Sequence, residues 1–535
     1  MHTLFTLIGL YCMSDQLNWN VPIDLTKQEK WICSKLKRTG KLFIFLRQNR
    51  HLIFTEEINR KLLSMYDDHP RGKPSVAPAL LAMASLLQAY GQVSDASAVL
   101  DSIFDQRWQM VLGCLGHDMA PFSQGTLCDF RHRLVRYNLD VMLLERTVEI
   151  AKDVGGFCYK QLRIALDSAP LQGLGRVEDT FNLIGHALEL LVDCAAQIKQ
   201  IPASEIIQGA GLCIIGQSSI KAALDIDWSD SQEKKNAINT LIKDVDAMRK
   251  WLTNQPLDFR NNQYLKEVLV LLETVLTQNI EPDPDGAGSK IIDGVAEDRR
   301  ISITDKDMRH GRKSSSRTIN GYKQHVAIEL DHKLILATCV RPANEPEHHA
   351  SEWLKPKIEK FGTVISTHID RGYLAADWTA ELYQQGKTVV AKPWNPATKG
   401  KFGKKAFNID LQEKKVTCPA GNTVKITGEL GNLRARYSSE TCGNCPKKNK
   451  CTDSKHGRTL TIHNQEAMLQ SLRHYIETPE GRLQTRERVK IEHTLASICN
   501  RKGPKARYMG LRLNEYDLNR TAIITNLHTV MRLAA

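Results

Sequence analysis

Two short apolar runs, each followed at once by an aspartate, constrain the fold of this chain more than any other feature. Asp167 follows the run 162–166, and Asp370 follows the run 364–369. Apolar runs of this length, bounded by turn signals, are typical of buried strands. Because binding sites in open sheets gather at the carboxyl ends of strands, the sequence predicts an α/β fold with both aspartates at strand ends.

A third carboxylate, Glu492, lies in the helix-like stretch 486–495. Hard cations such as Mg²⁺ prefer oxygen ligands, and two such ions can activate an attacking oxygen and stabilise a leaving one. We therefore predict that Asp167, Asp370 and Glu492 bind Mg²⁺ (or Mn²⁺) and are catalytic. Taken singly, each has a simpler interpretation: the aspartates as turn residues that end strands, and Glu492 as a surface ion-pair partner.

Two rival carboxylates, Asp305 and Asp307, lie in the polar and basic stretch 301–316. This stretch is expected to be a loop before the next strand. No apolar run leads into this loop. Asp305 and Asp307 are therefore weaker candidates for metal ligands than Asp167 and Asp370.

The apolar spacing predicts a mixed organisation of helical and strand-rich parts. After a loop at 168–176, helices are expected at 181–195, 232–251 and 264–276, followed by a break at 281–288. The next elements follow the order β-β-α-β-α-β: a hairpin (324–330 and 333–340), a helix (347–360), the strand before Asp370, a helix (377–385) and a strand (387–392).

These patterns predict seven parts of the chain. They are an N-terminal segment (1–39), an all-α DNA-binding domain (40–155), the first strand of an α/β catalytic core (160–176), a helical insertion (177–290), the remaining core strands (300–397), a small Cys-rich insertion (398–477), and a catalytic helix with a basic C-terminal region (478–535).

The net charge of +13 at pH 7 suggests a polyanionic partner, because Lys and Arg release counterions when they neutralise phosphates. A basic soluble enzyme without such a partner would share this charge. Ser123 is a predicted N-cap, and the helix that it begins carries Arg131 and Arg133 on a basic face that either meets the DNA backbone or is a solvated helix surface. No apolar run approaches the roughly 20 residues that a membrane span needs.

Thirteen cysteines, an odd and mostly dispersed number, fit a reducing compartment better than a disulfide framework. Cys418, Cys442, Cys445 and Cys451 cluster with the spacing of a tetrahedral zinc site, which would be structural because four ligands leave no open position. An iron–sulfur cluster and metal-free thiols remain alternatives. The first twelve residues are faintly signal-like, and Met13 is an equally good start.

Together these motifs resemble bacterial insertion-sequence transposases of the DDE type, which have an RNase H-like core. The residues that carry the resemblance are 122–139 in the N-terminal domain, 164–168 and 368–373 around the two aspartates, 321–325 at the start of the second strand, 488–492 around the glutamate, and 508–510 with 526–527 in the closing segment. It covers residues from about 40 to 533, and the order and spacing of the motifs are more specific than any single one.

The third motif departs from the family pattern. Thr485 stands where the family usually has Tyr, and Cys499 stands where it has Lys. Arg501 or Lys502 would substitute for that Lys. The long helical segment between the first two strands is also unusual.

The resemblance implies metal-dependent cleavage at the ends of a mobile element, followed by strand transfer into target DNA, a form of DNA recombination. It implies double-stranded DNA as partner (the terminal repeats of the element and the target), a homodimer that joins two ends, and a cytoplasmic, nucleoid-associated location in a bacterium. Arg488, Lys490 and Lys502 are then expected to contact DNA.

Three other interpretations stay open at this point. The first is a nuclease with the same core that cuts DNA without joining it. The second is an inactive DNA-binding derivative, although such a chain would be expected to have lost a carboxylate. The third is a zinc-dependent regulator, which leaves the aspartates after the apolar runs unexplained.

Overall fold

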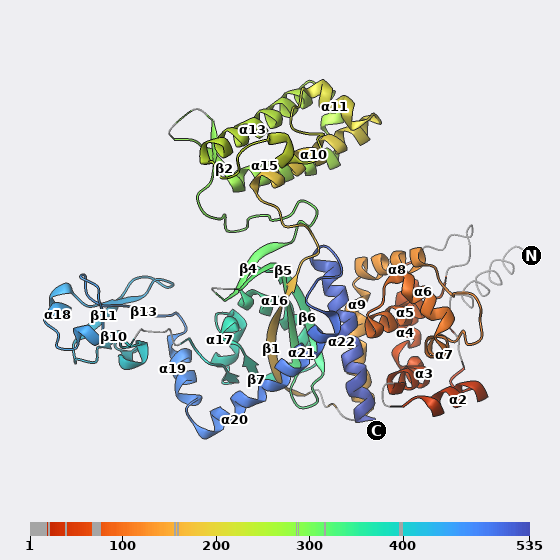
Figure 1. Cartoon of the computed structure of the whole chain (residues 1–535). Helices are drawn as coiled ribbons and strands as arrows, with labels where there is room; N and C mark the ends of the chain where they lie inside the picture. The colour runs from red at the N-terminus through yellow and green to blue at the C-terminus, as the bar shows by residue number, and fades with distance from the viewer. Residues whose placement is uncertain are drawn as a thin grey trace, which may run out of the picture.

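The computed structural model describes residues 19, 22–37, 40–66, 76–154, 157, 160–284, 286, 288–314, 317–394 and 400–534. Met1 and Met13, the two candidate starts, lie outside these residues. The described part has an all-helical N-terminal region, a central mixed sheet, and two smaller bodies that project from the sheet (Figure 1). The predicted α/β class is therefore confirmed at this level.

The N-terminal region is built from helices, as the apolar spacing predicts. They are α2 (Lys27–Lys35), α3 (Lys41–Ile53), α4 (Glu56–Leu63), α5 (Pro78–Gly91), α6 (Asp95–Phe104), α7 (Gln106–Leu112), α8 (Gln124–Arg136) and α9 (Leu139–Asp153). The Oγ of Ser123 accepts a hydrogen bond from the Thr126 amide at 3.1 Å, which confirms the predicted N-cap of α8. Helix α5 is apolar on nearly all sides and is buried among the others.

The central sheet holds six strands: β1 (Gln161–Gln172), β4 (Arg309–Ser314), β5 (Arg317–Glu329), β6 (Ile335–Pro342), β7 (Thr363–Ile369) and β8 (Thr388–Val390). Their order is β4-β5-β1-β7-β8, and β6 also pairs with β5. The β1–β5 and β5–β6 pairs are antiparallel, while β1–β7 and β7–β8 are parallel. With α16 (Ala350–Glu359) and α17 (Asp377–Gln384), the predicted β-β-α-β-α-β order after the insertion is confirmed.

Parts of two segments expected to be loops are strands. Strand β1 does not end at Asp167 but continues to Gln172, because β5 is long enough to pair with it as far as Gln172↔Gly321. A side chain at Gly321 would meet the β1 backbone at Leu171, and its φ of +153° lies in the region that favours glycine. Strand β4 likewise forms within the polar stretch 301–316, since the first half of β5 offers it an edge.

The C-terminal helices connect the sheet to the N-terminal region. They are α19 (Glu466–Tyr475), α20 (Pro479–Glu487), α21 (Val489–Lys502) and α22 (Leu511–Leu533). Helix α22 lies between α9 and α5 on one side and β6 on the other (Figure 1). In it, Asn526 accepts a hydrogen bond from the Ile335 amide at 2.7 Å and donates to the Ile335 carbonyl at 2.8 Å. One continuous hydrophobic core therefore joins the N-terminal helices, the sheet and α22.

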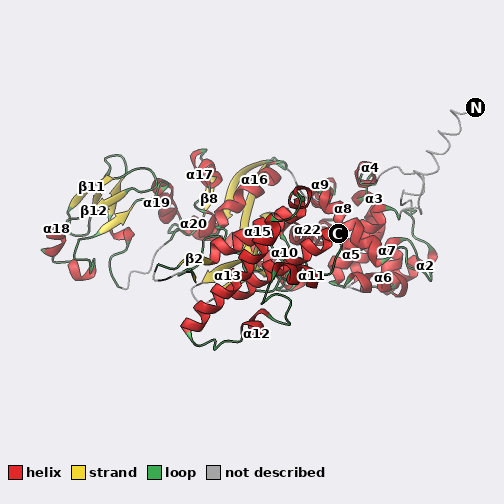
Figure 2. Ribbon diagram, turned by 90° about the horizontal axis from the view of Figure 1, so that it is seen from above, coloured by secondary structure: helices red, strands yellow, loops and turns green. Residues whose placement is uncertain are grey.

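Two further bodies have hydrophobic cores of their own. The helical one contains α10 (Thr180–Lys199), α11 (Ala203–Ala210), α12 (Ile220–Leu224), α13 (Ser231–Thr253), α14 (Leu257–Arg260), α15 (Gln263–Asn279) and the hairpin β2 (Ile280–Pro282) and β3 (Ser289–Ile291). The other is a small sheet of β9 (Asn408–Asp410), β10 (Lys415–Thr417), β11 (Thr423–Thr427), β12 (Arg434–Arg436) and β13 (Thr459–Thr461), with α18 (Ser439–Gly443) beside it (Figure 2). Among the described helices, none is both long and apolar enough to cross a membrane.

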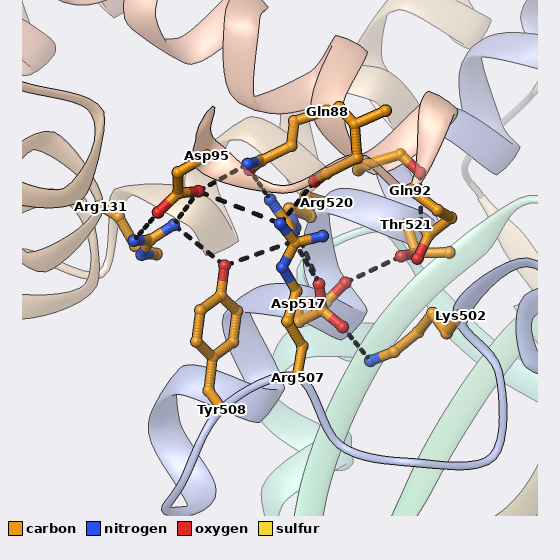
Figure 3. Close-up of polar contacts among 12 residues, drawn as sticks. Gln88, Gln92, Asp95, Arg131, Lys502, Arg507, Tyr508, Asp517, Arg520 and Thr521 are labelled. Atoms are coloured by element: carbon orange, nitrogen blue, oxygen red, sulfur yellow. Dashed lines mark hydrogen bonds and ion pairs between the residues drawn. The ribbon is translucent and has the colours of Figure 1, made fainter. Parts of the chain in front are cut away.

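A buried network of charges fastens α22 to the helices around it (Figure 3). Asp517 of α22 forms ion pairs with Arg520 at 2.6 Å and with Lys502 of α21 at 2.8 Å. Arg520 in turn donates to Gln88 Oε1 of α5 at 2.6 Å. Although burial alone would raise the pKa of Asp517, Lys502 and Arg520 hold it well below its ordinary value.

The substitution Asp517→Asn tests this network. It leaves Arg520 and Lys502 buried without their counter-charge, so we expect the free energy of unfolding to fall by about 3–5 kcal/mol. Urea unfolding followed by circular dichroism measures the change. The control is Glu57→Gln in the exposed Glu57–Lys61 pair of α4, which should leave the unfolding midpoint unchanged. Equal midpoints for wild type and Asp517→Asn would contradict the prediction.

Candidate active site

The three predicted carboxylates are brought together by one guanidinium. Arg488 lies 2.9 Å from Asp370 Oδ1, 3.0 Å from Glu492 Oε1 and 3.9 Å from Asp167 Oδ2. Segments that are far apart in the chain therefore meet at one point. Because all three carboxylates contact Arg488, they form one site and are not unrelated acidic residues on the surface.

Each carboxylate is positioned by a different element. Asp167 is the first residue of β1 beyond its parallel pairing with β7, which ends at Leu166↔Ile369. Asp370 follows β7 directly and precedes the short helix η3 (Arg371–Tyr373). Both aspartates thus lie at the carboxyl end of the parallel pair, even though β1 itself runs further.

Glu492 reaches the site because α21 lies across β1 and β5. Ile491, Leu495 and Ile498 are the buried face of this helix. Glu492 lies on the more exposed side, one turn after Arg488, the residue that joins α20 to α21. The spacing of four residues places both side chains on one face.

A cavity of about 820 Å³, open to solvent, surrounds the three carboxylates. Basic side chains that the sequence analysis did not assign line it as well: Arg312, Lys323 and Arg371. An acidic centre among basic residues suits a ligand that carries phosphate, because the centre can hold cations while the basic residues contact the phosphates.

The two aspartates have pKa values that are pushed in opposite directions. Burial raises the pKa of Asp167 to about 6, only partly opposed by the Ser168 amide and Arg488, and the negative charges of Asp370 and Glu347 add to the rise. Burial also acts to raise the pKa of Asp370, but hydrogen bonds from the Arg371 backbone and from Arg488 outweigh it and hold the pKa below its ordinary value. Such divergent pKa values are typical of functional sites.

Glu347 is a fourth carboxylate in the cavity, and the sequence analysis missed it. It begins the short helix η2 (Glu347–His349), just before α16. Its Oε1 accepts a hydrogen bond from Ser168 Oγ at 2.5 Å. In the sequence it is the first residue of a predicted helix, where an acid is common for reasons of helix electrostatics, so no pattern distinguishes it.

The predicted DNA-contacting residues are placed in different surroundings. Arg131 is buried in an ion pair with Asp95 at 2.8 Å, and the buried side chain of Lys502 pairs with Asp517, so both belong to the network of Figure 3. Both residues therefore have structural partners inside the protein. Arg488 is at the site itself.

The remaining two predicted contacts are more accessible. Lys490 pairs with Glu487 at 2.7 Å and is partly exposed, and the guanidinium of Arg133 lies 4.7 Å from the centre of the Tyr66 ring. Arg501, the other substitute for the missing lysine, lies 5.3 Å from the centre of the Tyr90 ring, away from the cavity.

The rival carboxylates hold the start of α22 instead of lining the cavity. Asp305 accepts hydrogen bonds from the Tyr322 hydroxyl and, at 3.3 Å, from the Gly510 amide. Asp307 accepts one from the Leu511 amide at 3.0 Å. Neither lines the cavity, so their surroundings give them a structural role.

The four clustered cysteines line one small cavity of about 20 Å³ in the small sheet body. None of them forms a disulfide, and the Arg458 amide donates to Cys442 Sγ at 3.4 Å. Burial, together with the negative charge of the cysteines, raises the pKa of the adjacent Tyr437. Within the described part of the chain, no group of three or more His, Cys, Asp or Glu side chains already stands in an arrangement that would hold a metal ion.

Any divalent ion among Asp167, Asp370 and Glu492 has to displace the Arg488 guanidinium. We therefore expect Arg488→Gln to bind Mn²⁺ several-fold more tightly than wild type, because the competing ion pairs are lost. Electron paramagnetic resonance (EPR) of free Mn²⁺ measures the affinity. Arg486→Gln, an exposed neighbour on α20, is the control and should bind as wild type does. Weaker binding by Arg488→Gln would contradict the competition.

Two family models match parts of the chain. The family described as Transposase DDE domain matches residues 417–531, which include Glu492 and the four clustered cysteines, and Transposase domain (DUF772) matches residues 34–133. A search of curated proteins found no match, and neither did a search of solved structures. The matched domains support a transposase function. Both matches bear out the resemblance reached from the motifs: two parts of the chain are similar to transposase domain families, consistent with an insertion-sequence transposase of the DDE type.

Proposed function

We propose that this chain is a metal-dependent DNA transposase in which Asp167, Asp370 and Glu492 bind two Mg²⁺ (or Mn²⁺) ions. It cuts the ends of an insertion sequence and transfers the freed strands into target DNA. The observation that carries the proposal is the contact of one guanidinium, Arg488, with all three carboxylates. The match to the Transposase DDE domain supports it independently.

The order of the strands supports an RNase H-like core. A central β1 has an antiparallel neighbour on one side, which continues to β6, and two parallel strands on the other. The first two carboxylates stand at the end of the parallel pair, and the third comes from a helix across the sheet. The three separate hydrophobic cores support treating the helical and Cys-rich segments as insertions.

The donor set fits hard divalent cations, because all three side chains offer oxygen ligands and the cavity is open to solvent. When bound, two such ions activate an attacking oxygen and stabilise the leaving one. Asp167 must lose its proton to serve as a ligand. Arg488, once released from the carboxylates, is free to contact a DNA phosphate, and Arg312, Lys323 and Arg371 contact phosphates around the cavity.

The reaction needs no covalent enzyme intermediate. In cleavage, a water oxygen forms a bond to the end phosphorus and the bond to the 3′ oxygen breaks, leaving a 3′-hydroxyl. In strand transfer, that hydroxyl attacks a target phosphodiester and displaces its 3′ oxygen. Positioning and charge stabilisation account for such catalysis. Because two DNA ends have to meet, the proposal includes a homodimer.

The test is Mg²⁺-dependent cleavage and joining of the element's own end DNA by wild type and Asp370→Asn. We expect wild type to cut and join, and the variant to bind DNA with activity reduced at least about a thousandfold, because it loses a metal ligand. Asp293→Asn in the exposed loop after β3 is the control and should remain active.

Each other outcome has a distinct meaning. Cutting without joining by wild type would identify a nuclease with the same core. Binding without cutting by wild type would identify an inactive DNA-binding derivative. Full activity of Asp370→Asn would refute the assignment of the carboxylates.

We also propose that Cys418, Cys442, Cys445 and Cys451 bind a structural Zn²⁺. Four free thiols around one small cavity, Cys418 from the turn after β10 and the other three from the stretch 442–451, are the donor set that tetrahedral zinc prefers. Because the body that contains them has a core of few residues, a metal would supply much of its stability.

Zinc content tests this second proposal. Elemental analysis of the purified protein should give one zinc per chain, and Cys442→Ser should lose it, because three thiolates and a hydroxyl bind zinc more weakly. Cys213→Ser, an exposed cysteine of the helical body, is the control and should keep its zinc. Iron in place of zinc would support the iron–sulfur alternative, and a wild-type protein free of metal would refute the site.

A further inference from the structure

The carboxylate of Glu347 is held between the two segments that carry the aspartates of the site. Ser168, which donates to its Oε1 at 2.5 Å, follows Asp167 directly. Its other oxygen, Oε2, lies where a Cβ of residue 372 would stand, so the glycine found there lets Glu347 take this position without a shift of its side chain. Gly372 lies two residues after Asp370. The fold therefore brings Glu347 to the point where β1 and the end of β7 meet.

The balance of charges around the cavity favours a metal-binding role for Glu347. Two divalent ions bring four positive charges, whereas Asp167, Asp370 and Glu492 supply three negative ones. Arg488, Lys323 and Arg371 line the same cavity and add positive charge. Glu347 is the additional carboxylate that lines this cavity, and it acts electrostatically on both Asp167 and Lys323.

We propose that Glu347 is a fourth metal-binding residue of this site and holds one of the two divalent ions together with Asp167. The proposal rests on the proposed function, since it concerns the same ions. A residue that served only to brace the loop would act through its hydrogen bond with Ser168 and would not need its charge.

Two substitutions separate these roles. Glu347→Gln removes the charge but keeps an oxygen that can accept from Ser168 Oγ. Ser168→Ala removes the hydrogen bond but keeps the charge. Mn²⁺ titration of the full-length protein, followed by EPR, counts the ions bound and their affinities. Glu352→Gln on the exposed side of α16 is the matched control.

We expect wild type, Glu352→Gln and Ser168→Ala to bind two Mn²⁺ ions. Glu347→Gln should bind one of them at least about tenfold more weakly. Glu347→Asp, which keeps the charge on a shorter side chain, should recover part of the lost affinity. Circular dichroism and the unfolding midpoint establish that each variant is folded. Should Glu347→Gln not fold, recovery of binding by Glu347→Asp relative to Glu347→Ala decides the question.

Two results would overturn the assignment. If Glu347→Gln binds two ions with wild-type affinity while Asp370→Asn loses them, the role of Glu347 is refuted and the proposed function stands. The same holds if Ser168→Ala loses an ion and Glu347→Gln does not, since Glu347 would then be a brace. If Asp370→Asn also binds Mn²⁺ as wild type does, the proposed metal site fails, and the role of Glu347 fails with it.

Discussion

The buried carboxylate of Asp517 is the interaction on which the rest of the structure depends. Its two cationic partners come from α21 and α22, and Arg520 extends the contact to Gln88 of α5. Charges buried this deeply are tolerated only when they are paired and hydrogen-bonded, so the network specifies one arrangement of these helices. Because α21 also carries Glu492, the same network that joins the N-terminal helices to the sheet fixes the helix of the site.

The site combines a rigid part with an adjustable part. Asp167 and Asp370 are held by paired strands at the centre of the sheet, where the backbone has little freedom. Glu492 stands on the first turn of α21, Arg488 directly precedes that helix, and both side chains are partly exposed. Under the proposed function, the long side chain of Arg488 leaves the carboxylates when metal ions bind and contacts a DNA phosphate instead.

The sequence was informative where chemistry and periodicity coincide. Asp167 and Asp370 could be predicted because each follows an apolar run, and Glu492 because it lies in a helix-like stretch. Local patterns carry no information about pairing partners, which is why β1 proved longer than its apolar run: β5, far along the chain, offers an edge as far as Gln172. Glu347 escaped prediction for the same reason, since only the tertiary fold brings η2 beside Ser168.

The sequence also did not indicate which charged residues are buried. Arg131 and Lys502 look like surface cations in the sequence, yet each has a carboxylate partner on another helix, Asp95 and Asp517. Nothing local to Arg131 indicates that Asp95 will be its neighbour. The sequence alone therefore does not indicate which basic residues near a predicted DNA-binding site reach the surface and which are buried in ion pairs.

The helical body interrupts the sheet between β1 and β4, and this has a consequence for how the protein is made. Asp167 leaves the ribosome long before Asp370, and Glu492 later still. The hydrophobic core that supports all three is completed only when α22 takes its place against β6 and α9. The helical and Cys-rich bodies, with cores of their own, can fold earlier, during synthesis. An unfinished chain thus has folded parts but no assembled site, so the candidate active site is completed only once α22 has emerged.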